Sequence, residues 1–398
     1  MLTKFIQSLE DPRKPLLAPN YWMLTKTGLI LPPSKIKRTI YITIHEIVTL
    51  FVFTQFMELY VIRSNLDLVL TNLKISMLSC VCIVKSNTCV AWQHHWIEVI
   101  EYITKADKEE RDNANLKRSI ILEKYTKYCR FITGFYWVLV FSTFITVTHT
   151  PVLQFVSSRT FRENLLNGTE PFPHIFSSWM PFDKYHSPGC WITVVWHAIL
   201  CAYGAALMAA YDIGAVVMMV YFGGKLDLLR ERCKDILGTD YEGVSDDEAI
   251  NSIRKLHNSH VLLVKYSKLF NSLLSPVMFF YMVMCSLMLC ASAFQLTSAN
   301  DTAQMILMAE YLIFGVAQLF LFCWHSNVVL YKSQRVSEGP YESAWYKASI
   351  RQRRCIVLLL AQLQKRVFFT AGPFTNLTLS TFITILKGAY SYYTLLRK

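Results

Sequence analysis

The amino-acid sequence predicts an all-α, polytopic membrane protein with seven transmembrane helices, its N-terminus in the cytoplasm and its C-terminus outside the cell. Three observations support this prediction: an apolar composition, apolar stretches of membrane-spanning length, and basic residues concentrated in alternate loops. Hydrophobic residues make up 53% of the 398 residues and aromatic residues 14%, whereas charged residues reach only 17%. Such a composition is typical of a chain that folds in lipid.

Seven stretches have the length that a membrane-spanning helix requires. A helix rises about 1.5 Å per residue, so about 20 mostly apolar residues cross the hydrocarbon layer. The second stretch is the weakest, because Asp67 and Lys74 interrupt it. The expected spans are residues 39–62, 66–84, 131–151, 191–222, 269–297, 305–330 and 376–396.

The distribution of basic residues predicts the orientation. With loops assigned alternately to the two sides, one side holds 30 Lys and Arg residues and the other side holds 6. Cytoplasmic loops carry the excess of positive charge in membrane proteins, so the N-terminus is expected inside. This topology accounts for the net charge of +12 without any nucleic-acid partner.

Two glycosylation sequons agree with this orientation. Asn167 and Asn300 begin Asn-x-Thr sequons in two loops that are separated by two predicted spans, and therefore lie on the same side. That side is the one poor in positive charge, as extracellular acceptor sites require. We expect glycosylation at both positions.

The predicted organisation has four parts: a cytoplasmic segment (1–38), a bundle of six spans (39–330), a cytoplasmic anchor segment (331–373) and a last span (374–398). Within the bundle, apolar residues recur at helical spacing among the charges of the cytoplasmic loops 85–130 and 223–268. This spacing predicts helical extensions that leave the membrane and form an anchor domain.

Two local signals mark helix ends in these cytoplasmic parts. Ser245 and Glu248 have the Ser-x-x-Glu spacing of a capping box, which predicts a helix beginning there. The amphipathic segment 341–370 is expected to be helical, and Ala371-Gly372-Pro373 follows it. Proline removes a backbone donor and clashes with the preceding turn, so the break separates this segment from the last span.

The sequence contains no sign of an enzyme. A Gly-rich phosphate loop, a His-Glu-x-x-His zinc motif and a Gly-x-Ser-x-Gly elbow are all absent from it. We therefore expect no catalytic residue, no cofactor and no metal site. His94 and His95 lie beside Trp92 and Trp96 where a span meets the cytoplasm, and we interpret them as part of an interfacial aromatic belt.

Ionisable side chains inside predicted spans are candidates for function, because placing a charge in lipid is costly. Those near a membrane interface can extend their polar ends into water instead. Asp212 lies deeper and is expected either to pair or to line water. The set comprises His45, Glu46, Glu58, Lys74, His197, Asp212, Glu310 and His325.

The outer halves of the spans are rich in aromatic and flexible apolar side chains with few polar ones. Such residues suit a pocket for a small, mostly apolar ligand, although helix–helix packing explains each of them singly. The candidate ligand-binding residues are Met77, Leu78, Phe141, Phe144, Ile145, Thr148, Trp196, Leu200, Tyr203, Met308 and Tyr311.

The last span differs from the others because it mixes Ser and Thr with aliphatic residues. A hydroxyl-bearing face can line a water-filled pore or can bond to a neighbouring helix. Thr384 and Ser391 are the candidate pore residues of this kind, and Leu395 could form an apolar constriction. Lys387 within this span is unfavourable for a cation pore unless it points away from the axis.

The C-terminal region resembles the signature of the insect odorant receptor family over about 50 residues. The long outer loop and Met180-Pro-Phe-Asp183 before the fourth span agree with that family. The matching elements are Ser343-Ala344-Trp345-Tyr346, the basic run Arg351 to Arg354, Ala371-Gly372, Phe374, Leu377 to Phe382, Ile385-Leu386-Lys387 and Ala389-Tyr390-Ser391-Tyr392.

The resemblance implies a ligand-gated, non-selective cation channel in the plasma membrane of sensory dendrites. It implies a heterotetramer in which a ligand-tuning subunit, such as this chain, combines with a co-receptor subunit and binds a small volatile odorant. It also implies a pocket among the second, third, fourth and sixth spans with help from the fifth. The last helix would line the pore, with Tyr392 and Leu395 near the gate by their distance from the C-terminus.

Three alternatives remain at the level of sequence. A G-protein-coupled chemoreceptor requires the opposite orientation, and a gustatory-receptor-like channel has a similar architecture. A secondary transporter would show internal repeats and paired broken helices, of which the sequence has one break and no repeat.

Overall fold

The computed structural model describes residues 9–64, 66–157, 162–163, 172, 174–237, 245–298 and 302–396. Within these residues the chain is almost entirely helical, as the sequence predicts. The helices are α2 (Ala18–Lys26), α3 (Lys35–Val61), α4 (Leu66–Ala91), α5 (Gln93–Asp112), α6 (Leu116–Ser157), α8 (Gly189–Lys234), α9 (Asp246–Ser298), α10 (Thr302–Arg335), α11 (Glu338–Tyr341), a 3₁₀ helix (Trp345–Lys347), α12 (Ile350–Leu363) and α13 (Leu379–Leu396).

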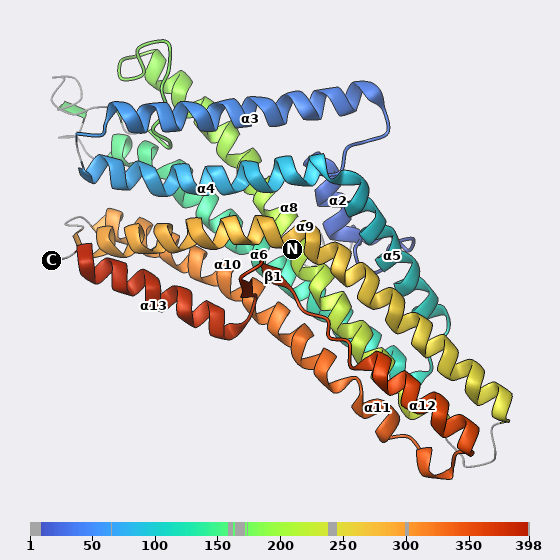
Figure 1. Ribbon diagram of the computed structural model, residues 1–398. Coiled ribbons are helices and arrows are strands. Elements are labelled where there is room, and N and C mark those ends of the chain that lie inside the picture. The colour runs from blue at the N-terminus through green and yellow to red at the C-terminus, as the bar shows by residue number, and fades with distance from the viewer. Residues whose placement is uncertain are drawn as a thin grey trace.

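Six of these helices are long and apolar enough to cross a membrane: α3, α4, α6, α8, α9 and α10. They contain the first six predicted spans. The seventh, α13, has 18 residues and lies against α9 and α10 (Figure 1). Ser, Thr and Lys residues interrupt its apolar sequence.

Several helices continue well beyond the expected spans and build a separate end of the molecule. At this end α6 and α9 begin and α8 and α10 finish, and all four extend past α5. Helices α11 and α12 lie beside them at the lower right of Figure 1. We call this the anchor end. The opposite end, where α4, α8 and α10 begin, is called the outer end, and α13 finishes there too.

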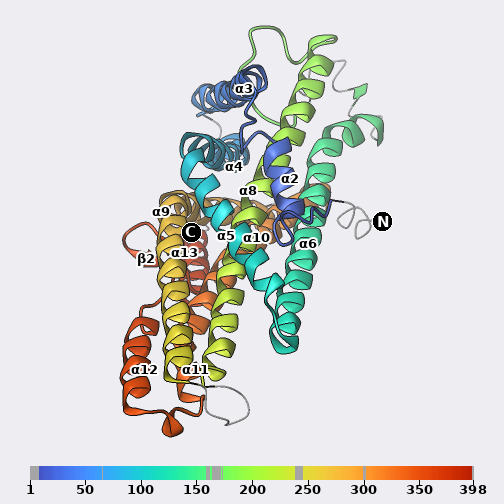
Figure 2. The same cartoon turned by 90° about the vertical axis from the view of Figure 1, so that its right-hand side faces the viewer.

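Helix α8 occupies the centre of the bundle. Figure 2 shows it running between α6 and the group of α9, α10 and α13. Nearly all its residues from Leu207 to Leu229 are buried. Small side chains allow the neighbouring helices to approach closely, as at Gly214, where Leu24 of α2 packs on the backbone. The main hydrophobic core surrounds this helix.

The predicted helix start at residue 245 is confirmed. The Glu248 amide donates to Ser245 Oγ, and the Ser245 amide donates to the Glu248 carboxylate, so both bonds of a capping box form. A second capping box, with Ser349 and Gln352, begins α12.

The predicted helix over 341–370 is wrong at both ends. The α-helix α12 covers only Ile350–Leu363 of this segment. Beyond it the chain becomes extended, and the Val367 amide donates to Ser333 Oγ of α10 at 2.7 Å. The expected break follows as a short antiparallel hairpin of β1 (Thr370–Ala371) and β2 (Thr375–Asn376).

This hairpin is fastened to α9. The Thr370 amide donates to Asn271 Oδ1 at 2.8 Å, and the Gly372 amide donates to the Ser275 carbonyl at 3.0 Å. Gly372 adopts a φ of 65°, and a Cβ there would lie 2.9 Å from the Phe279 ring. Only glycine fits this position without strain. The hairpin therefore fixes the start of α13 on α9.

Ion pairs hold the anchor end together. Glu110 of α5 is buried and accepts from Lys225 at 2.8 Å and from Arg118 at 3.1 Å. Burial raises the pKa of the Glu110 carboxyl, but the nearby cations outweigh burial and lower it overall. The group stays ionised at neutral pH and links α5 to α8.

Candidate functional site: an apolar cavity between two buried lysines

A cavity of about 110 Å³ lies among α3, α4, α6, α8 and α10 in the outer half of the bundle. Aliphatic and aromatic side chains form most of its wall, and Ser79, Thr143 and Tyr311 provide its hydroxyl groups. An apolar cavity with a few polar groups is the usual form of a small-molecule site.

Four of the predicted ligand-binding residues line this cavity: Leu78 of α4, Phe144 of α6, Leu200 of α8 and Tyr311 of α10. They come from the second, third, fourth and sixth predicted spans. Within the described residues the fifth span, in α9, contributes nothing to the cavity wall. The structure thus brings these four side chains together around one space.

The other seven predicted residues lie elsewhere. Phe141, Ile145 and Trp196 are exposed on the bundle surface, and the Phe141 side chain is 62% accessible. The remaining four are outside the cavity lining as well. Met77 is half-buried, the Thr148 hydroxyl donates to the Phe144 carbonyl, the Tyr203 hydroxyl donates to the Thr27 carbonyl, and Met308 contacts Lys74.

Sequence reasoning missed the contribution of α3. Val48, Phe51 and Val52 form one side of the cavity, and Phe176 of the outer segment joins them. The Phe51 and Phe176 rings meet edge to face with centroids 5.5 Å apart. The apolar residues of the first span are spread around the helix, so no pattern within it distinguishes a cavity-facing residue from one that faces lipid.

The outer segment that precedes α8 is held over the cavity by polar contacts. Lys184 pairs with Glu58 of α3 at 2.7 Å and donates to the Ser178 carbonyl at 2.9 Å. The Ser178 hydroxyl and His197 Nε2 are 2.9 Å apart. Glu58 and His197, two of the ionisable residues singled out in the spans, therefore hold this segment in place. Asn167 and Asn300 lie outside the described residues.

A buried polar network closes the inner end of the cavity. Lys85 Nζ of α4 lies 2.6 Å from Asp212 Oδ1 of α8, and the Tyr136 hydroxyl of α6 donates to Asp212 Oδ2 at 2.7 Å. Gln318 of α10 also donates to Asp212 Oδ2. Asp212 was expected either to pair or to line water, and the structure shows that it pairs. The sequence analysis did not identify its partner, Lys85.

The position of this network follows from helix periodicity. Each member lies about one turn closer to the anchor end than a cavity-lining residue on the same helix. Lys85 follows Cys82 on α4, and Asp212 follows Met208 on α8. In the same way, Gln318 follows Phe314 on α10, and Tyr136 precedes Val140 on α6, which runs the other way. The four side chains therefore lie just beyond the inner end of the cavity lining, and we call them the floor of the cavity.

A second buried lysine lies at the outer end of the same cavity. Lys74 is 1% exposed, one turn before Leu78 on α4, and its Nζ contacts Met308 Sδ at 2.5 Å. The same atom lies 5.5 Å from the centre of the Tyr311 ring. Lys74 has no carboxylate within ion-pair distance among the described residues.

Helix α13 carries a polar stripe on an exposed face. Five exposed side chains recur at alternating spacings of four and three residues, which places them along one side of the helix. The predicted pore residues Thr384 and Ser391 lie on this stripe, whereas Tyr392 is exposed on a different side. The Leu395 side chain is outside the described residues. The polar stripe consists of Ser380, Thr384, Lys387, Ser391 and Thr394.

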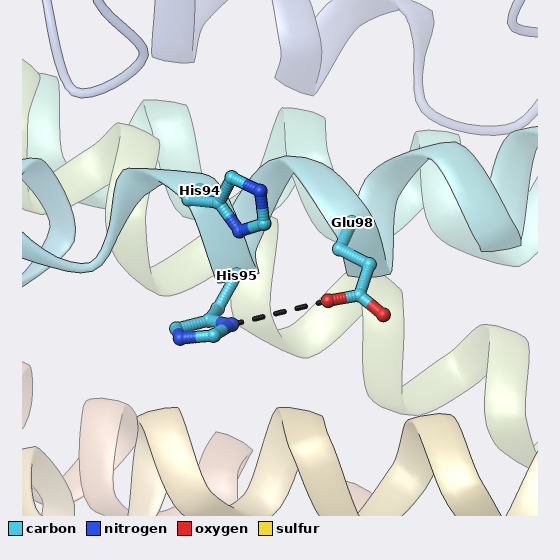
Figure 3. A group of neighbouring side chains, drawn as sticks. All are labelled: His94, His95 and Glu98. Carbon is cyan, nitrogen blue, oxygen red and sulfur yellow. Dashed lines mark ion pairs between the residues drawn. The ribbon is translucent and has the colours of Figure 1, made fainter.

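Three side chains near the start of α5 gather as in a metal site: His94, His95 and Glu98 (Figure 3). They offer ligand atoms within 4.8 Å of one another, and His95 Nδ1 lies 3.9 Å from the Glu98 carboxylate. Both histidines are exposed. The positive end of the helix dipole disfavours a cation at this position. We assign no metal to this group.

Comparison with known proteins places the chain in a family. The family model described as 7tm Odorant receptor matches residues 65–390. Odorant receptor 10 of Aedes albopictus is 26% identical over 219 residues, which cover 54% of this chain and 57% of that protein. Odorant receptor Or2 of Anopheles gambiae is 33% identical over 141 residues, which cover 35% of this chain and 37% of that protein. The chain thus spans only part of the length of these relatives.

Solved structures share the fold. The olfactory receptor OR5 of Machilis hrabei, in complex with eugenol, superposes with a TM-score of 0.79 over 99% of this chain and 98% of that chain, at 16% identity. A second structure of the same receptor gives a TM-score of 0.78. Together with a family match over most of its length, this fold shows that the chain is a multi-pass membrane protein belonging to the 7tm odorant receptor family.

Proposed function

We propose that this chain is the ligand-tuning subunit of an odorant-gated, non-selective cation channel that assembles with a co-receptor into a heterotetramer in the plasma membrane. The observation that carries this proposal is the apolar cavity in the outer half of the bundle. The receptor OR5 of Machilis hrabei, which shares the fold, was solved in complex with the small aromatic compound eugenol. A volatile compound of comparable chemistry would occupy the cavity here.

The cavity is connected to α13 through packed helices. Tyr311, Phe314 and Gln318 lie on α10, and α10 and α9 carry α13 on their outer surface. A ligand that binds more tightly when these helices are displaced would shift α13 and favour an open state. A ligand with equal affinity for both states would open nothing.

The polar stripe of α13 supports a pore. The hydroxyls of Thr384, Ser391 and Thr394 donate to backbone carbonyls of their own helix. Their oxygen lone pairs are then available to a permeating cation. Lys387 lies on the same stripe, so in a pore it would repel cations, and a co-receptor would reduce the number of such lysines per channel.

The test is whole-cell current in cells that express this chain with and without an insect odorant co-receptor, across a panel of volatiles, with G-protein signalling blocked. We expect a fast inward cation current only when both chains are present. Currents abolished by the block would contradict the proposal and favour a G-protein-coupled receptor.

The substitution Lys387→Gln tests whether the current passes along α13. Removing this positive charge should increase calcium permeability relative to sodium and shift the reversal potential. Lys105→Gln on α5, where the side chain is exposed, is the matched control and should leave the reversal potential unchanged. An unchanged value in both variants would place the pore elsewhere.

A further inference from the structure

Lys74 differs from the other buried lysines of the described chain in its surroundings. Lys85 has Asp212 at 2.6 Å and Lys225 has Glu110 at 2.8 Å. Lys74 is equally buried, yet its nearest polar contacts are the Met308 thioether and the Tyr311 ring. A thioether is a weak acceptor, and an ion in a protein interior normally requires an opposite charge.

The amine lies close to the cavity, because its Nζ is 5.5 Å from the ring centre of Tyr311, which lines it. Ile75 and Leu78, next to Lys74 and one turn after it on α4, both line the cavity, and so does Tyr311. A lysine side chain has several rotatable bonds, so its amino group can leave the Met308 sulfur for a ligand atom at the outer end of the cavity. An oxygen acceptor there would replace a weak contact with a strong one.

No Lys, Arg, Asp or Glu side chain is among the described residues that line the cavity. The polar groups of the lining are hydroxyls and thiols, among them Ser79, Thr143 and Cys82, and the neutralised pair of Lys85 and Asp212 lies one turn beyond it. Within the described residues, Lys74 is the one buried lysine beside the cavity that lacks a carboxylate partner, and the carboxylate of Glu310, next to Tyr311, accepts from the Ser142 hydroxyl instead.

We propose that Lys74 makes this receptor selective for small carboxylic acids, with the ligand carboxylate paired to the amine and the alkyl chain directed toward the floor. This inference deepens the proposed function, because it takes the cavity as the odorant site. The ligand would supply at Lys74 the negative charge that Asp212 supplies at Lys85 and that no described carboxylate supplies at Lys74. Binding forms an ion pair and no covalent bond.

The test compares pentanoic acid with 2-hexanone, in which a methyl group replaces the acid hydroxyl. In cells that express the chain and a co-receptor, we expect the acid to activate at a concentration about tenfold lower than the ketone, since a charge-assisted hydrogen bond contributes about 1.5–3 kcal/mol. Lys74→Met should remove this difference by weakening the acid response and sparing the ketone response. Lys105→Met is the control and should preserve the difference.

A second measurement separates this inference from the channel proposal. For the purified full-length chain, pentanoic acid should raise the thermal unfolding temperature of the unmodified protein and of Lys105→Met, but not of Lys74→Met. This shift without any current would retain acid binding and reject the channel. An equal response to acid and ketone in the unmodified protein, or an acid preference that survives Lys74→Met, would overturn the inference.

Discussion

The two buried lysines of α4 differ in one respect that decides their roles. Lys74 and Lys85 are 11 residues apart, which is about three helical turns, so they lie on one face of the helix roughly 16 Å apart. Lys85 is neutralised by Asp212 of α8, and Tyr136 and Gln318 from two further helices complete the network. Among the described residues, the Lys74 amine contacts the Met308 sulfur and lies near the Tyr311 ring. A charge in a membrane helix thus serves the structure when its partner is built in, and remains available to a ligand when its partner is absent.

The largest effect is expected from breaking the paired lysine. Asp212→Asn leaves the buried Lys85 ammonium without a counter-charge, which should destabilise the folded protein by about 3–5 kcal/mol. The measurement is thermal unfolding of the purified protein, with the fraction at the cell surface as a second readout. The double variant Lys85→Met with Asp212→Asn should recover most of the loss. If the single and double variants were equally unstable, the two side chains would not be coupled.

A smaller loss is expected from removing one hydrogen bond of the floor. Tyr136→Phe deletes the hydroxyl that donates to Asp212, and a hydrogen bond to a charged group contributes about 1.5–3 kcal/mol. Tyr211→Phe is the matched control, because the Tyr211 hydroxyl is buried and has no hydrogen-bond partner among the described residues. Unfolding temperatures that fall equally in both variants would rule out a special role for the Asp212 contact.

The smallest effect, with the opposite sign, is expected at Lys74. Lys74→Met removes a buried charge without leaving a carboxylate unpaired, so stability should stay the same or rise by about 1 kcal/mol. Lys85→Met, which strands Asp212, should lower stability in the same unfolding assay. A marked destabilisation by Lys74→Met would show that its contacts with Met308 and Tyr311 are structural.

Much of the fold could be predicted from the sequence because its causes are local or additive. Length and apolar content define spans, the capping box at Ser245 begins α9, and Gly372 followed by Pro373 ends the anchor segment. The extent of α12 could not be predicted. The segment after Leu363 is held in an extended conformation by hydrogen bonds to residues of α10 and α9, which are distant in sequence.

The cavity was harder to predict, because its wall depends on how each helix is rotated. Phe141 and Phe144 are three residues apart in one apolar run, but only Phe144 faces the cavity while Phe141 is exposed. A helix that is apolar on every side gives no hydrophobic stripe to orient it. The predicted second span ended at residue 84, so Lys85 was not considered as a residue within a span. The spacing of Lys85 from Lys74 nevertheless places both lysines on one face of the helix.

The attachment of the β1–β2 hairpin to α9 makes the start of α13 a pivot. Gly372 and Thr370 hold that end to the α9 backbone and Asn271, whereas the other end of α13 lies at the outer end of the molecule. Displacement must then grow with distance from the hairpin. A tilt of about 10° would move the far end of this 18-residue helix, about 27 Å long, by roughly 5 Å. Any such tilt would therefore move Thr394 several times farther than Ser380.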